Sequence, residues 1–111
     1  MALQAAGAGV LQIDFAKETA WCSPEFERIV GRTLTAEQVR TELWSVLDGD
    51  DPETRSAIAR WWENGASGGL DLRIRRPNGE RRWIRLFCET KRDRNGAPYR
   101  LAGLVQDIDA A

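Results

Sequence analysis

Histidine is missing from the 111-residue sequence. It is the commonest general base and metal ligand near neutral pH, so its absence argues against most acid–base, nucleophilic and metal-dependent catalysis. Cysteine is scarce as well, since only Cys22 and Cys88 occur, without CxxC or another metal-ligand spacing. We therefore predict a protein that is not an enzyme, that holds no metal, and whose two thiols are free and buried in a reducing compartment.

Long apolar runs and a strong charge imbalance are also lacking. No stretch approaches the ~20 apolar residues that cross a bilayer, and the Ala/Gly-rich start has no charged segment of a secretory signal. The net charge is -1. The last 42 residues are distinctly basic, with 10 basic and 6 acidic side chains in residues 70–111, which solvated positions of a sheet explain. We expect one cytoplasmic domain that neither inserts into a membrane nor binds nucleic acid.

The first half of the chain predicts a hairpin followed by three helices. Residues 9–15 and 19–22 alternate apolar and polar side chains around a short polar turn. Ser23 before a proline predicts a helix that ends at Gly31, and Thr35 with Gln38 predicts a capping box for a helix that ends near residue 48. Asp51 before a proline predicts a third helix that stops near residues 64–65.

The second half changes to the period of β-strands. Residues 70–75, 81–90 and 99–109 predict three strands, because apolar and polar side chains alternate in the first two and apolar residues crowd the third. Asn78-Gly79 is a strong hairpin signal, and residues 93–96 (DRNG) form a second turn. The predicted class is therefore α+β with the order ββαααβββ.

Two local motifs stand out in this order of elements. Residues 21–26 (WCSPEF) with 29–31 (IVG) form a strand-to-helix step, and 72–84 (LRIRRPNGERRWI) form a hairpin followed by Arg-Trp-Ile. Both resemble signatures of the PAS family of sensory and interaction modules. Residues 47–51 (LDGDD) lack the family's His-Pro. The resemblance implies a PAS domain over 9–109, with a five-stranded antiparallel sheet in the order 2-1-5-4-3 and helices on one face. Residues 1–8 are then a flexible lead-in and 110–111 the end of the module.

The last strand ends in GLVQDID, which resembles the Gly-x-x-x-Asp-Ile-Thr that closes many PAS domains. In the family this motif joins the sheet to an output segment, often a histidine kinase of a two-component system or a diguanylate cyclase. We therefore assign Asp107, Ile108 and Asp109 to signal transmission, with Asp109 in the place of the threonine. Since the chain stops at Ala111, we expect an excised bacterial module or a stand-alone adaptor.

The resemblance places any ligand pocket between the third helix and the inner face of the sheet. Its walls are the apolar residues Ile58, Trp61, Trp62, Leu72, Ile74, Ile84, Leu86, Cys88 and, more weakly, Leu104. The alternative is a filled core, because a chain of this size needs its large apolar side chains for stability.

No cofactor is predicted from the sequence. Histidine-ligated haem is excluded because no histidine is present. The flavin–cysteine adduct of light-sensing relatives requires a cysteine on a helix, whereas both cysteines here fall in predicted strands. A non-covalent flavin or a small metabolite stays open.

The alternation sends Trp83, Arg85 and Phe87 to the opposite, outer face of the sheet. Aromatic residues beside an arginine have the composition of an interface centre, so we predict a homodimer, with cover by residues 1–8 as the alternative. Ligand capture in the pocket is a second functional hypothesis. A third is a small α+β enzyme with Asp71 or Glu89 as a base, although both lie on the outward phase of their strands.

Overall fold

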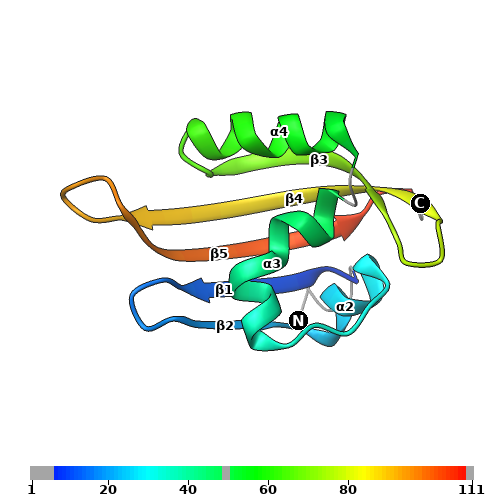
Figure 1. The fold of residues 1–111 in the computed structure, drawn as a ribbon, viewed down its shortest axis with the longest axis horizontal. Coiled ribbons are helices and arrows are strands. Elements are labelled where there is room, and N and C mark those ends of the chain that lie inside the picture. The colour runs from blue at the N-terminus through cyan, green and yellow to red at the C-terminus, as the bar shows by residue number, and fades with distance from the viewer. Residues whose placement is uncertain (1–6, 49–50, 110–111) are drawn as a thin grey trace.

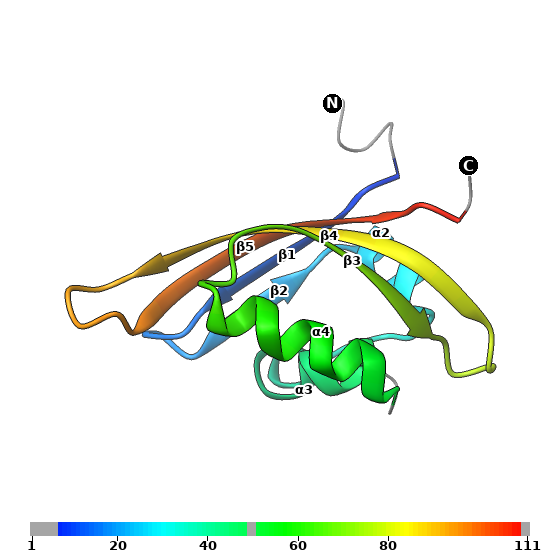
Figure 2. The same cartoon turned by 90° about the horizontal axis from the view of Figure 1, so that it is seen from above.

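The computed structural model describes residues 7–48 and 51–109. The elements follow in the order β1 (Gly9–Asp14), β2 (Thr19–Cys22), α2 (Pro24–Val30), α3 (Ala36–Asp48), α4 (Pro52–Glu63), β3 (Gly68–Arg75), β4 (Arg81–Arg92) and β5 (Pro98–Asp107). The strands form one antiparallel sheet in the order β2-β1-β5-β4-β3, and α3 and α4 lie across one of its faces (Figures 1 and 2). The predicted fold class, element order and strand order are confirmed.

The helices begin where the sequence places their caps. The Ser23 hydroxyl accepts a hydrogen bond from the Phe26 amide at 3.3 Å, and the Asp51 carboxylate accepts one from the Glu53 amide at 3.0 Å. Thr35 and Gln38 form the reciprocal capping box. Each cap supplies an acceptor for backbone N–H groups at a helix start that would otherwise lack one.

The core lies between the helices and the inner face of the sheet. Alternation in β3 and β4 buries the predicted inner residues Leu72, Ile74, Ile84, Leu86 and Cys88. Helix α3 adds a stripe of Val39, Leu43 and Leu47, which lie four residues apart on one helix face and are also buried. One continuous apolar cluster therefore joins sheet and helices.

The prediction that Leu104 lies on the inner face of the sheet is wrong. In β5 the side chains of Leu101 and Val105 point inward and Gly103 is buried between them, so Leu104 is on the outer phase and half-buried. It pairs directly with Phe87 of β4. The apolar run Gly103-Leu104-Val105 conceals the alternation, because glycine marks an inward position without a side chain.

The two cysteines are free, as predicted. Cys88 is buried in β4, but Cys22 is only half-buried, which corrects the prediction for that residue. Cys22 lies in β2, a strand at the edge of the sheet that has a neighbour on one side only.

The predicted ends of the module fall largely outside the described residues. This applies to residues 1–6 of the predicted flexible lead-in and to residues 110–111. In the part of the chain that the structure describes, no helix is long and apolar enough to cross a membrane.

Candidate functional site

The residues predicted to line a pocket meet between α4 and the inner face of the sheet. Ile58 and Trp61 are buried against that face, while Trp62 is half-buried. The structure thus brings the predicted residues together, except for Leu104. Their role in binding a ligand remains a prediction.

Aromatic rings occupy the space between α3, α4 and the first hairpin. The ring of Trp44 meets those of Trp61 and Trp62 edge to face, with centroids 5.8 and 5.7 Å apart. Phe15 meets Trp62 at 6.3 Å, and the Arg92 guanidinium lies 6.0 Å above the Trp62 ring. Trp44 and Phe15 were not predicted here, although Trp44 directly follows Leu43 of the α3 stripe. Such contacts favour a packed interior.

Aromatic side chains fill much of the interior beneath α4. Neither Trp61 nor Trp62 lines any of four hollows among the described residues. Both cysteines are in strands, as predicted, and burial raises the pKa of Cys88 to about 12. A thiol with that pKa is almost entirely protonated at neutral pH and unreactive.

One polar atom in this interior lacks a partner. The indole Nε1 of Trp61 is buried and has no hydrogen-bond acceptor among the described residues. A buried donor without an acceptor costs free energy, so this atom is the one feature of the interior that favours a small ligand or a water molecule.

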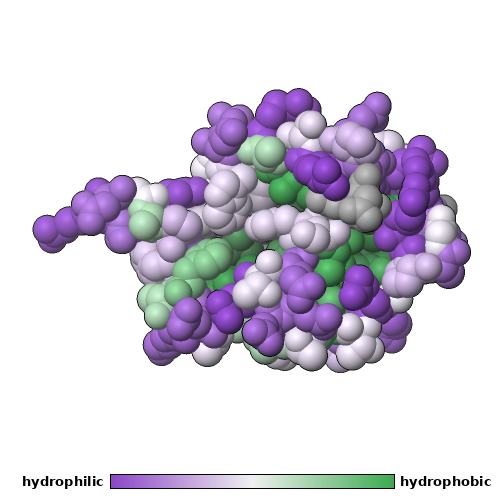
Figure 3. Space-filling model, viewed as in Figure 1, coloured by the Kyte–Doolittle hydropathy of each residue, from purple (hydrophilic) through white to green (hydrophobic). Residues whose placement is uncertain are grey.

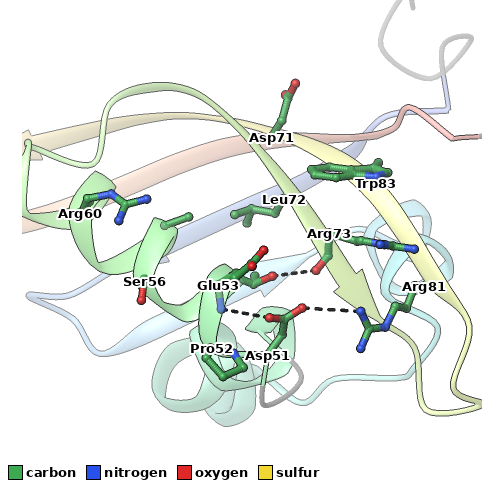
Figure 4. Close-up of a pocket in the computed structure, with 12 residues that line it drawn as sticks. Asp51, Pro52, Glu53, Ser56, Arg60, Asp71, Leu72, Arg73, Arg81 and Trp83 are labelled. Atoms are coloured by element: carbon green, nitrogen blue, oxygen red, sulfur yellow. Dashed lines mark hydrogen bonds and ion pairs between the residues drawn. The ribbon is translucent and has the colours of Figure 1, made fainter.

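A groove lined by charged residues lies on the surface beside α4. It has a volume of about 550 Å³ and lies between the first turns of α4 and β3 (Figure 4). Arg60, Arg73 and Arg81 line it together with acidic residues, and the buried Thr54 hydroxyl donates to the Arg73 carbonyl at 2.9 Å. Viewed from the helix side, hydrophilic side chains gather around most of the rim, and hydrophobic ones show between them across the middle of the face (Figure 3). The groove shares only Leu72 with the predicted pocket.

The opposite face of the sheet carries large exposed aromatic side chains. Trp83 is 43% exposed and Phe87 57%, as their outward phase predicts. Phe87 and Leu104 are cross-strand partners, and Leu104 also pairs with Val10 of β1. Trp21 on β2 is 52% exposed.

We name Val10, Trp21, Phe87 and Leu104 the outer apolar band. Sequence reasoning missed Trp21, although it alternates with the inward Ala20 and Cys22 of β2. The band crosses four strands, and Figure 2 shows no helix over this side of the sheet in the described residues.

Arg85 lies between Trp83 and Phe87 and is held by an acidic neighbour. Its Nε and Nη2 donate to the two carboxylate oxygens of Asp71, its cross-strand partner, at 2.8 and 3.1 Å. This hydrogen bonding lowers the pKa of Asp71 and raises that of Arg85. The two parallel hydrogen bonds restrict the guanidinium to one orientation beside Asp71 and leave the pair without net charge.

The enzyme alternative needs a carboxylate that is buried beside an apolar cavity. Asp71 is exposed and ion-paired with Arg85, and Glu89 is exposed on β4. Neither carboxylate is buried beside an apolar cavity. The geometry does not support this alternative.

Two of the three residues assigned to signal transmission, Ile108 and Asp109, form hydrogen bonds with the backbone of Trp83. The Ile108 amide donates to the Trp83 carbonyl at 3.0 Å, and the Trp83 amide donates to the Asp109 carboxylate at 2.8 Å. Asp107 accepts a hydrogen bond from Arg82 at 2.7 Å. The sequence motif did not identify Arg82 as a partner, because the two residues lie on different strands.

A family model described as PAS fold matches residues 19–105. No curated protein matches the sequence.

Among solved structures, the chain is similar to a sensory box histidine kinase/response regulator from Burkholderia thailandensis. The identity is 23% and the TM-score 0.69, with 96% of this chain and 81% of that chain covered. It is also similar to the N-terminal domain of a diguanylate cyclase with a PAS/PAC sensor from Marinobacter aquaeolei, with 19% identity, a TM-score of 0.69, and 93% and 96% coverage.

A third similar structure is the LOV domain of a blue-light-activated histidine kinase from Erythrobacter litoralis. Here the identity is 19% and the TM-score 0.63, with 90% of this chain and 94% of that chain covered. These likenesses show the same fold. Because the family model spans most of the chain, this protein belongs to the PAS family.

Proposed function

We propose that this domain is a non-catalytic signalling module of a bacterial, cytoplasmic signal-transduction protein. In this proposal two copies pair through Trp83 and Phe87 on the outer face, and the segment Asp107–Asp109 passes a conformational bias to an output domain. The observation that carries it is the bonding of Trp83 to both Ile108 and Asp109, which links the exposed face to the end of β5. The sensor modules of kinases and a cyclase among the similar structures support the same role.

The composition of the outer face supports a second copy as its occupant. The outer apolar band and Trp83 form an exposed apolar surface on one side of the sheet. Surfaces of this kind mark protein contacts, and aromatic residues and arginine dominate their energetics. Because Asp71 neutralises Arg85, the centre of the face can be buried without leaving an unpaired charge.

Replacing both aromatic residues tests the dimer. We expect Trp83→Ala with Phe87→Ala to weaken self-association by about 100-fold or more, because each is an interface anchor of the kind worth ~2 kcal/mol. Native mass spectrometry over a dilution series measures it. Tyr99→Ala is the matched control, since Tyr99 is 38% exposed but lies outside the band. A double variant as dimeric as the parent, or a parent that is monomeric throughout, would contradict the proposal.

Ligand capture is the second candidate, and the unpaired Trp61 Nε1 favours it. A small ligand with an acceptor for this N–H is then expected to quench tryptophan fluorescence saturably. At 100 times its Kd it is expected to raise the free energy of unfolding by about 2.7 kcal/mol. The probes are riboflavin, flavin mononucleotide and a set of small carboxylates. Trp61→Phe removes the donor, with Trp62→Phe as the control, and no saturable response to any probe would rule this candidate out.

A further inference from the structure

Arg76 joins the last turn of α2 to the turn that connects β3 and β4. Its Nε donates to the Ile29 carbonyl at 3.0 Å, and its Nη2 contacts the Arg28 carbonyl at 3.4 Å. These carbonyls belong to a helix end, where intrahelical donors run out. Gly31 makes room for the side chain, because a Cβ at this residue would lie 3.1 Å from Cγ of Arg76.

The same guanidinium reaches the end of β5. Its Nη1 donates to Glu80 at 2.6 Å, and its Nη2 lies 3.7 Å from the Asp107 carboxylate. Arg82 bonds to that same carboxylate oxygen. The Arg76 and Asp107 side chains are 19% and 14% exposed, so solvent screens this pair less than an ordinary surface ion pair.

From Asp107 the bonding continues to the outer face. Its second carboxylate oxygen accepts from the Asp109 amide at 3.0 Å, and the Asp109 carboxylate accepts from the Trp83 amide at 2.8 Å. The path from α2 through Arg76, Asp107 and Asp109 to Trp83 is therefore continuous.

Helix α2 also touches the start of the sheet. A Cβ at Gly9, the first residue of β1, would lie 2.6 Å from the Phe26 backbone, so α2 rests directly on this strand. Gly7, Glu25, Arg76 and Asp107 line one hollow of about 440 Å³ beside α2. Helix α2 thus contacts both the beginning of β1 and, through Arg76, the end of β5.

We propose that Arg76 is the positioning residue that makes the docking of Asp107–Asp109 on Trp83 depend on the position of α2. In this proposal the segment Asp107–Asp109 has two states: docked, with its hydrogen bonds to the Trp83 backbone formed, or released, with those bonds broken. A displacement of α2 moves away the carbonyls to which Arg76 donates. Arg76 is then less well positioned to pair with Asp107, and the released state of the segment is favoured. This inference rests on the proposed function, because it supplies the regulation of the same transmission segment.

Amide hydrogen exchange of Arg76→Met, followed by NMR, tests the coupling. We expect exchange of the Trp83 and Ile108 amides to accelerate at least tenfold, because their bonds depend on the docked segment. The amides of Ile13 and Leu101 in the β1–β5 pairing are expected to change less than twofold. Arg75→Met is the matched control, since Arg75 is the preceding, exposed residue of β3.

A uniform acceleration at all four amides, or none at Trp83 and Ile108, would overturn the inference. If Arg76→Met does not fold, Arg76→Lys keeps the charge but cannot make all the bonds of the guanidinium, and the same selective acceleration is expected. Gly31→Ala approaches the coupling from the α2 side. Its Cβ would lie 3.1 Å from Cγ of Arg76, so it shifts the side chain without removing the guanidinium, and the same selective acceleration is expected. Native mass spectrometry measures the self-association of the same variants separately. A failure of the proposed dimer can therefore be told apart from a failure of the proposed coupling through Arg76.

Discussion

Leu86→Ala is expected to lower the free energy of unfolding by about 2–5 kcal/mol, the range of large-to-small substitutions in packed cores. Leu86 is fully buried on the inner face of β4, with Leu70 and Val105 as its cross-strand partners. Removing its side chain leaves a cavity that the flanking strands cannot close, because their hydrogen bonds fix the spacing. Urea unfolding followed by tryptophan fluorescence measures the loss.

Phe87→Ala is the control for this experiment, because Phe87 is the next residue of the same strand and points to the other face. We expect its effect on the unfolding of the monomer to stay within about 1 kcal/mol, since an exposed ring contributes little to the core. The comparison is made at a protein concentration where the chain is monomeric, so that association does not contribute. A cost for Phe87→Ala as large as that for Leu86→Ala would mean that the outer face is covered within one chain.

Gly9→Ala is expected to destabilise the domain by about 3 kcal/mol, at the upper end of the range for overpacking. A Cβ at Gly9 would lie 2.6 Å from Cα and 2.7 Å from N of Phe26, and 2.8 Å from Cγ1 of Val105. Two of these atoms are backbone, so relief requires the whole of α2 to move away from β1. Thermal and urea unfolding of the variant measure the cost.

Gly69→Ala provides the matched control in another strand. The nearest atom to a Cβ at Gly69 is a ring carbon of Phe87 at 3.8 Å, an ordinary contact, and its φ is not in the left-handed region. We expect a change within about 0.5 kcal/mol, as for surface substitutions. Equal effects of the two alanines would show that the close approach of α2 to Gly9 does not exist in solution.

Most of the fold could be predicted from the sequence because its signals are local. Ser23, Thr35 and Asp51 cap the helices as predicted, since a cap depends on residues two or three positions away. The alternation in β3 and β4 predicted the inner and outer faces because a strand has a period of two. Leu104 was misplaced where glycine interrupts that signal.

The candidate site was only partly predictable. Trp83 and Phe87 followed from their phase in one strand, and the family motif indicated the segment at Asp107–Asp109. Neither Arg76 nor Arg82 was singled out, because their partners lie on other elements. The aromatic cluster around Trp62 likewise draws Phe15 and Trp44 from separate segments.

The sequence by itself determined the order of the elements, their caps, the alternating faces of β3 and β4, and the PAS resemblance, since each depends on residues close together in the chain. Only the tertiary structure decided that aromatic rings fill the space beneath α4. It alone brought the Arg76 guanidinium to the carbonyls of α2 and Trp83 to Asp109. Those contacts depend on strand pairing and helix packing, which join residues far apart in the chain at distances that no local pattern encodes.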